Sequence, residues 1–251
     1  MLRLVIFIGM ISAPLVISVI IIMLILGRIK PKSDDVSTIT RKPDYHYYNS
    51  DYYLLTQTPY KKILEDKGIQ GEYLCYNCLK QTAGYKKFVF NAYLPTDTGT
   101  TEIDLIMIHG TGIYVIESKN LDGLIKGHSG DIKWTQYFRG HKRYSFYNPI
   151  RQNDRHIEEL KKHLPVLNEE AYKSIIVFNP LSNIKEIANE TNAKAVKRNE
   201  LIVAIEMILS REPNRFKEEH IDRIQDILLQ FTYKSDDEKS DHIQNIRCYK
   251  K

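Results

Sequence analysis

Residues 102–119, EIDLIMIHGTGIYVIESK, contain two apolar runs that flank a cluster of small and polar residues, His109 to Gly112. Two such runs around a turn-like cluster are typical of a β-hairpin. The second run is apolar on both faces, because residues 113–116 read IYVI without interruption. A strand that is apolar on both faces is covered on both sides, so the hairpin is predicted to lie inside a sheet flanked by other layers.

This hairpin carries charges that a covered strand would normally exclude. With a loop at His109 to Gly112, paired residue numbers sum to 221, so Asp104 is predicted to face Glu117. Side chains directly opposite each other lie about 4.5–5.5 Å apart at Cβ, and Lys119 shares their face because strand side chains alternate. Opposed carboxylates either take up a proton or bind a divalent cation. The alternative is a structural ion network in which Lys119 pairs with Glu117 or with Glu102.

The rest of the chain predicts mixed strands and helices. Helical periodicity covers residues 58–81, with a break near Gly68 to Gly71 and a new start just before Glu72. Asn148 as N-cap and Pro149 at the first helical position open a further helix with one apolar face. Further strands are expected at 87–94, 132–138, 142–147 and 172–178, and further helices at 201–209 and 217–231. This order indicates a layered α/β or α+β domain.

The N-terminal segment 4–27, LVIFIGMISAPLVISVIIIMLILG, is 24 residues without a charge. At about 1.5 Å per residue, a helix of this length can cross a hydrocarbon core of roughly 30 Å. A secretory signal peptide is the alternative, but its apolar region is usually about 7–15 residues, and no small-residue cleavage site precedes Arg28. Arg28, Lys30 and Lys32 follow the run, whereas Arg3 precedes it. The positive-inside rule therefore predicts a single-pass membrane protein whose C-terminal domain lies in the cytoplasm.

These features predict four parts of the chain. They are an anchor with a basic flank at residues 1–30, a polar linker at 31–57, a folded domain at 58–232 and a polar tail at 233–251. The linker is rich in tyrosine and contains Lys-Pro pairs, which suits a spacer.

The net charge of +5 is concentrated near the predicted anchor. Residues 1–32 hold four of the 36 Lys and Arg and none of the 31 Asp and Glu, which leaves 32 bases against 31 acids beyond them. A local excess remains at residues 126–163, with nine Lys and Arg against four acids. This strip is either a phosphate-facing surface or an ordinary solvated one.

The three cysteines indicate no disulfide framework in a cytoplasmic chain. Cys75 and Cys78 form a C-x-x-C, but a zinc site needs four ligands, and Cys248 stands alone in the polar tail. The pair is predicted to pack inside a helix. Trp134 is likewise expected to pack, because a single aromatic residue is no stacking platform.

Asp104, followed after twelve residues by Glu117-Ser118-Lys119, resembles the D…(D/E)-x-K core of the PD-(D/E)xK nuclease superfamily. The chain is more closely similar to the nuclease-related, or NERD, domain over residues 68–153. The resemblance rests on GIQGEYL with Glu72, on EIDLIMIHGTGIYVIESKNLDGLI, on Trp134 and on YNPIRQN. Two positions depart from the superfamily pattern, since Ile103 precedes the aspartate where proline is usual and Ser118 replaces a more hydrophobic residue. Neither departure removes a ligand.

The resemblance implies a restriction-endonuclease-like mixed sheet flanked by helices, and it implies a role for each matching residue. Asp104, Glu117 and Glu72 would be ligands of Mg²⁺ or Mn²⁺, Lys119 the catalytic lysine, and Gln152 a phosphate contact or a support for Lys119. The leading hypothesis is a membrane-anchored, metal-dependent nuclease that hydrolyses phosphodiester bonds, with DNA as the expected substrate. The basic residues predicted to contact nucleic acid are Arg151, Arg155, Lys142 and Arg143.

Two other functions remain open from the sequence. One is a non-catalytic nucleic-acid-binding or scaffold module with the same fold. The other is a structural membrane protein whose acidic residues form ion pairs.

Overall fold

The computed structural model describes residues 42–43, 46–138, 140, 142–185 and 193–232. The chain divides into two units, residues 1–32 and 33–251. The predicted membrane anchor, the predicted tail and Cys248 all lie outside the described residues. Among the residues that are described, no helix is both long and apolar enough to span a bilayer.

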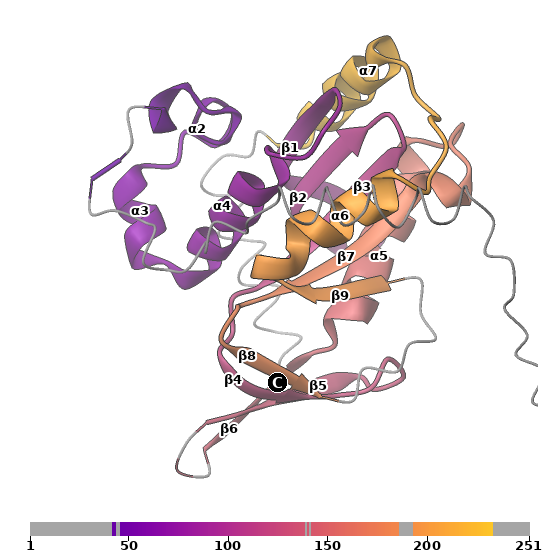
Figure 1. Cartoon of the computed structure of the whole chain (residues 1–251). Helices are drawn as coiled ribbons and strands as arrows, with labels where there is room; N and C mark the ends of the chain where they lie inside the picture. Colours follow the sequence, from indigo (N-terminus) through magenta and orange to yellow (C-terminus); the bar gives the residue numbers. More distant parts are fainter. Residues whose placement is uncertain (1–41, 44–45, 139, 141, 186–192, 233–251) are drawn as a thin grey trace, which may run out of the picture. The chain divides into compact units, whose positions relative to one another are not determined.

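The larger of two sheets has the strand order β1-β2-β3-β7-β9 (Figure 1). Its strands are β1 (Lys86–Thr96), β2 (Gly99–His109), β3 (Gly112–Lys119), β7 (Tyr172–Phe178) and β9 (Ala193–Lys197). The first three form an antiparallel meander, and β7 and β9 run parallel to β3. Strand β3 therefore lies at the centre of the sheet, as the double-sided apolar run predicts.

Helices cover both faces of this sheet. On one face, α4 (Lys67–Leu79) and α6 (Leu201–Leu209) pack against the larger apolar cluster. On the other, α5 (Pro149–His163) and α7 (Glu218–Leu229) pack against a second cluster. Figure 1 shows α6 in front of the sheet and α5 behind it. Helices, the larger sheet and further helices therefore form three layers of a mixed α+β fold.

A smaller sheet with the order β6-β5-β4-β8 lies beyond the end of β3 (Figure 1). Its strands are β4 (Gly123–Lys126), β5 (Lys133–Tyr137), β6 (Arg143–Tyr147) and β8 (Ser182–Lys185). Trp134 of β5 is 1% exposed, and its ring stacks on Phe178 of β7 at a centroid distance of 6.1 Å. The predicted packing role of Trp134 is thus confirmed, and this contact joins the two sheets.

Helix α5 begins as the sequence predicts. The Asn148 side chain accepts a hydrogen bond from the Ile150 amide at 2.9 Å, and Pro149 occupies the first turn. This cap satisfies one of the amides that a helix N-terminus leaves without an intrahelical partner. The Asn148 side chain also donates to the carbonyl of Asp131 at 2.7 Å, which ties the start of α5 to the loop before β5.

The predicted helical break near Gly68 to Gly71 is wrong by several residues. The break occurs at Asp66, between α3 (Tyr60–Glu65) and α4, because the Asp66 carboxylate accepts hydrogen bonds from two amides of the first turn of α4. Gly71 stays inside α4, where a Cβ atom would lie 2.8 Å from atoms of Ser118 and Asn120. The glycine is therefore needed for the close approach of α4 to the end of β3.

The C-terminal part of the predicted linker is folded rather than a spacer. Residues 47–49 form the short helix η2 (Tyr47–Asn49), and α2 (Asp51–Thr56) follows. Tyr47 and Tyr52 are each 1% exposed and pack edge-on against Tyr73 of α4. Edge-to-face aromatic pairs stabilise a core while the hydroxyl groups reach polar partners, which explains how a polar-looking, tyrosine-rich segment becomes buried.

Two further short helices, η3 (Glu169–Ala171) and η4 (Arg198–Glu200), precede β7 and α6. Cys75 and Cys78 of α4 are both free and buried in the core, which confirms the predicted packing role of the pair.

Candidate active site

The predicted hairpin register is confirmed. The β2–β3 ladder pairs His109 with Gly112 and ends at Leu105 and Ile116, so each pair of residue numbers sums to 221. Asp104 comes one position beyond the last pair, and its Oδ2 atom accepts a hydrogen bond from the Ser118 amide at 3.2 Å. The carboxylate thus occupies the point where β2 and β3 part.

The β1–β2 ladder is interrupted at the same level. Phe90 pairs with Leu105 and Ala92 with Ile103, but Asn91 has no partner in the ladder and adopts a left-handed φ of 51°. Leu105 belongs to the cluster under α4, whereas Ile103 belongs to the cluster under α5. Ile103 and Leu105 therefore point to opposite faces of the sheet, whereas regular alternation would put both side chains on the same face. Interruptions of this kind redirect a side chain out of the regular alternation of a strand.

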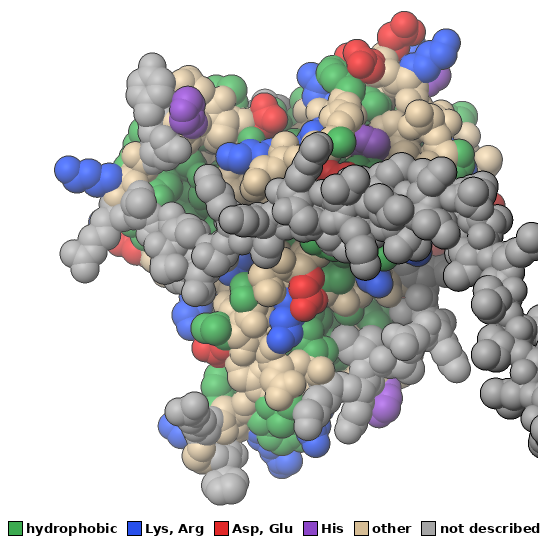
Figure 2. All heavy atoms as spheres, viewed as in Figure 1, with side chains coloured by type: hydrophobic (Ala, Val, Ile, Leu, Met, Phe, Trp, Pro, Cys, Tyr) green, Lys and Arg blue, Asp and Glu red, His purple; other side chains and the backbone are tan. Residues whose placement is uncertain are grey.

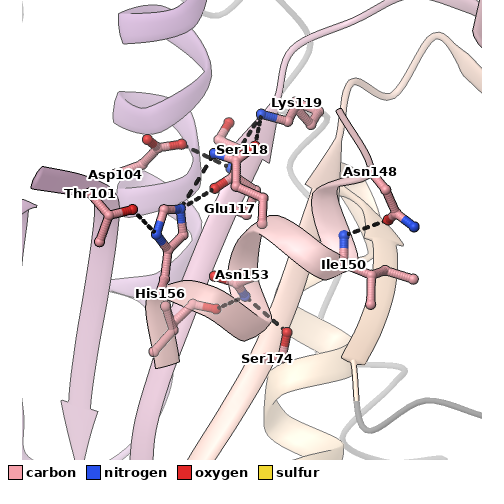
Figure 3. Close-up of polar contacts among 12 residues, drawn as sticks. Thr101, Asp104, Glu117, Ser118, Lys119, Asn148, Ile150, Asn153, His156 and Ser174 are labelled. Carbon is pink, nitrogen blue, oxygen red and sulfur yellow. Dashed lines mark hydrogen bonds and ion pairs between the residues drawn. The ribbon is translucent and has the colours of Figure 1, made fainter. Parts of the chain in front are cut away.

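Five side chains meet at the C-terminal end of β3. They are the predicted site residues Asp104, Glu117, Lys119 and Gln152, and one further histidine, His156. Lys119 Nζ forms an ion pair with Glu117 Oε1 and donates to Gln152 Oε1 of α5 at 3.1 Å. The other Glu117 oxygen, Oε2, lies 3.2 Å from His156 Nε2. Figure 3 shows Asp104, Glu117, Lys119 and His156 directed toward one another. Glu117 is 1% exposed, so both of its carboxylate oxygens bind partners in the interior.

His156 is a site residue that the sequence analysis missed. Its Nδ1 atom lies 2.9 Å from the Thr101 hydroxyl of β2, and its Nε2 atom also lies 3.4 Å from Gln152 Nε2. Because Nε2 faces a carboxylate, the hydrogen belongs on Nε2, and Nδ1 accepts from Thr101 when the ring is neutral. Gln152 and His156 are four residues apart on one helix and so share a face, which is a signal that the sequence contains.

The position of α5 is fixed by a buried amide. Asn153 Nδ2 donates to the carbonyl of Val115 and to the Ser174 hydroxyl, each at 2.9 Å, and the residue is 0% exposed. These bonds tie the helix to β3 and β7, and Figure 3 shows Asn153 on the same helix as His156, with its side chain directed toward Ser174. The Nδ2 group of this buried amide would lose both of its hydrogen bonds if the helix shifted, so the contact specifies one position of the helix on the sheet.

Glu117 and Lys119 are both charged in this environment. Burial opposes ionisation of Glu117, but the Lys119 charge and the His156 hydrogen bond outweigh burial and lower its pKa. Burial likewise opposes protonation of Lys119, but the charges of Glu117 and Asp104 outweigh burial and raise its pKa. A lysine with a raised pKa holds its proton at neutral pH. Lys119 is therefore suited to stabilise negative charge and not to accept a proton.

Glu72 and Asp104 are carboxylates that resist ionisation. Burial and the charge of Glu102 are the main causes that raise the pKa of Glu72 from 4.5 to about 8. Burial, Glu117 and Glu72 raise the pKa of Asp104 well above 3.8. Glu72 lies on α4 and the other carboxylates on β2 and β3, so the fold gathers acids from separate segments around one lysine.

These side chains fit a hard divalent cation by their chemistry. In the described part of the chain, no three His, Cys, Asp or Glu side chains are arranged as a ready set of metal ligands. Mg²⁺, however, is usually held by one or two carboxylates and retains several waters. Asp104 and Glu72 offer oxygen donors whose ionisation is disfavoured first by burial and then by neighbouring negative charge, and a cation would offset both. Asp104, Glu117 and Glu72 are the residues that would hold it.

We expect the metal-free protein to lose stability as the pH rises. Between pH 4.5 and about 8 the folded state binds a proton at Glu72 more tightly than the unfolded chain does, so the free energy of unfolding falls across this window. Because Glu72 interacts with other carboxylates and keeps some solvent exposure, the effect is smaller than the full pKa shift implies, and we expect a decrease of about 1–2 kcal/mol. Chemical denaturation in EDTA at several pH values measures it. The Glu72→Gln variant should show a flatter dependence, and a wild-type curve equal to that of the variant would contradict the assignment.

The four basic residues predicted to contact nucleic acid lie apart from this cluster. Arg151 and Arg155 are exposed on α5, the helix that carries Gln152. Lys142 and Arg143 are exposed at the start of β6 in the smaller sheet. The structure thus places two of them on the helix that contacts the carboxylate cluster and two in the smaller sheet, and their contact with nucleic acid stays a prediction.

Comparison with known proteins shows a similarity to one family over part of the chain. Residues 67–179, from the start of α4 to the residue after β7, match the nuclease-related domain, NERD. The matched segment includes Glu72, Asp104, Glu117, Lys119 and Gln152. The mixed α+β fold with two sheets is consistent with a nuclease-like fold.

One relative of this chain is an uncharacterized protein of Bacillus anthracis. The two are 34% identical over 143 residues, a region that covers 54% of this chain and 64% of that protein. The chain therefore spans less than two thirds of the relative's length. No solved structure matches the chain.

Proposed function

We propose that this domain is a divalent-metal-dependent nuclease that hydrolyses phosphodiester bonds, with DNA as its main substrate. The observation that carries the proposal is the arrangement at the end of β3. A charged lysine is held between Glu117 and Gln152, next to carboxylates that resist ionisation. The match to the nuclease-related domain over residues 67–179 supports it.

Each side chain has a role that follows from its environment. Lys119 keeps its proton and so provides a fixed positive charge for the negative charge that develops on the phosphate. Glu117 orients Lys119 through their ion pair, and Gln152 holds the same Nζ atom from α5. Asp104, Glu117 and Glu72 would hold Mg²⁺ or Mn²⁺, which when bound activates water and offsets phosphate charge.

A cleavage assay with the full chain tests the proposal. Labelled linear and circular DNA and RNA, single- and double-stranded, are incubated with Mg²⁺ or Mn²⁺ and, in parallel, with EDTA. We expect cleavage that requires the metal and that the Glu117→Gln variant lacks. Binding without cleavage under every metal condition would instead identify a non-catalytic nucleic-acid-binding module. Full activity of Glu117→Gln would refute the site assignment.

We also propose that residues 4–27 anchor the protein in a membrane with the C-terminal domain in the cytoplasm. The support is the length of the uncharged run and the basic residues that follow it. Carbonate extraction of membranes from expressing cells, followed by protease treatment of intact spheroplasts, checks both points. Release of the protein by carbonate would contradict the anchor.

A further inference from the structure

The outer face of the smaller sheet combines aromatic and basic side chains. Strands β4, β5 and β6 read GLIK, KWTQY and RYSFY, with three bases and no acid among them. Figure 2 shows hydrophobic and basic side chains together at the lower edge of the view, where Figure 1 places these strands. Such a charge balance favours a negatively charged partner.

The strand register assigns these residues to one face. Tyr137 of β5 lies between Leu124 of β4 and Arg143 of β6, and Thr135 lies between Lys126 and Ser145. Lys133 pairs with Tyr147 in the third row. Because side chains alternate, the residues of these three rows lie on one face, and all but Leu124 are aromatic, basic or hydroxyl residues. We call it the aromatic-basic face, and it consists of Leu124, Lys126, Lys133, Thr135, Tyr137, Arg143, Ser145 and Tyr147.

Tyr137 is the best-placed ring on this face. Its side chain is 37% exposed, and Lys126 Nζ lies 5.8 Å from the ring centroid. The exposed Arg143 is its cross-strand neighbour on the other side. A ring flanked by two cations on a sheet surface can stack on a base while the cations contact the adjacent phosphates.

The opposite face of the same sheet fixes its position next to the candidate active site. Ile125 and Trp134 are buried against Ile176 and Phe178 of β7. Phe178 is in turn the parallel-strand partner of Lys119. With strands about 4.8 Å apart and packed layers about 10 Å apart, the aromatic-basic face lies on the order of 20 Å or less from Lys119.

We propose that the aromatic-basic face binds an unpaired, single-stranded segment of the nucleic acid, with Tyr137 stacking on a base. This inference rests on the proposed nuclease function and names the form of substrate presented to that site. A duplex would contact this face only through its phosphates and the basic side chains, because its paired bases are not available for stacking on Tyr137. A sheet that displays aromatic rings among basic side chains is the arrangement by which several unrelated folds bind single strands.

The test is equilibrium binding measured by fluorescence anisotropy with the full chain. The probes are a fluorescein-labelled oligothymidine and a blunt duplex of equal length, both in EDTA so that no cleavage is needed. For Tyr137→Leu we expect about tenfold weaker binding of the single strand and little change for the duplex. Tyr85→Leu is the matched control, since Tyr85 is also 37% exposed and has Lys87 Nζ 5.5 Å from its ring centroid.

Three outcomes would overturn the inference. They are no binding of the single strand by the wild type, an equal loss of duplex and single-strand binding in Tyr137→Leu, and a loss no larger than that in Tyr85→Leu. Thermal unfolding of each variant verifies that it is folded, and Tyr137→Phe, which keeps the ring, should restore single-strand binding. A wild type that binds single strands through Tyr137 but never cleaves them would refute the proposed function and leave this inference standing.

Discussion

Replacement of Lys119 by methionine is expected to slow cleavage by about 10²–10³-fold, which is the usual cost of removing one charge-stabilising group from an active site. Methionine keeps most of the apolar stem but removes the cation that contacts Glu117 and Gln152. Substrate binding should change much less, because the proposed role of Lys119 concerns charge that develops during the reaction. Initial rates on labelled DNA at saturating Mg²⁺ measure the effect.

The control for this variant is Lys61→Met on α3, whose side chain is 82% exposed and pairs with Glu65 only at the surface. It loses the same charge far from the carboxylates and should cleave at the wild-type rate. Circular dichroism and thermal unfolding distinguish a catalytic loss from a folding defect. If folded Lys119→Met retained a third or more of the wild-type rate, Lys119 would be part of a structural ion network only.

The second large effect is expected at His156, which acts on the site through Glu117. His156→Ala should lower kcat by about 10–100-fold with a much smaller change in KM, because residues that orient a ligating carboxylate have effects of this size. The ring donates from Nε2 to Glu117, and Thr101 holds Nδ1, so loss of the ring frees the carboxylate to turn. Steady-state kinetics on one defined substrate separate the two parameters.

Rescue distinguishes positioning by His156 from simple packing. His156→Gln retains an N–H donor on a side chain of similar reach and should recover part of the lost kcat, whereas His156→Leu fills the space without a donor and should not. His220→Ala removes an exposed histidine of α7 and serves as the control. Equal rates for the Gln and Leu variants would show that His156 only fills volume.

The central hairpin was predictable because two strong local signals agree. The turn at His109 to Gly112 sets the register, and the period of two then determines which side chains share a face. The same holds for α5, where Asn148 and Pro149 mark the start and the apolar spacing marks the buried face. For these elements the local preference and the tertiary structure coincide.

Other features of the site depend on contacts between distant segments. The register predicted that Asp104 faces Glu117, but the ladder ends one pair earlier and Asp104 binds the Ser118 amide instead. The irregular backbone at Asn91 that accompanies this change involves β1, which no local pattern in the hairpin reports. An interruption of the β1–β2 ladder depends on both strands and on the packing against both faces of the sheet, so the sequence of one hairpin does not predict it.

The short elements were missed for a different reason. Strands β4 and β8 have only four residues each, too few for a period of two to stand out from chance, and β9 has five residues of which only Val196 is buried. Strand β8 is stabilised by parallel pairing with β4, and β9 by parallel pairing with β7, while Ile125 of β4 and Val196 of β9 are buried. His156 was missed because a histidine among the polar residues of an amphipathic helix gives no signal until its spacing from Gln152 is considered.

The Mg²⁺ dependence of the cleavage rate, compared between the wild type and Asp104→Asn, shows whether Asp104 holds a catalytic metal ion. Asparagine keeps the shape and the acceptor for the Ser118 amide but removes the charge that the buried carboxylate resists carrying. We expect a cleavage rate that rises and saturates with Mg²⁺ in the wild type, falls to background in EDTA, and requires at least about tenfold more Mg²⁺ in Asp104→Asn. Cleavage that persists in EDTA, or an identical Mg²⁺ dependence in the two proteins, would contradict this role of Asp104.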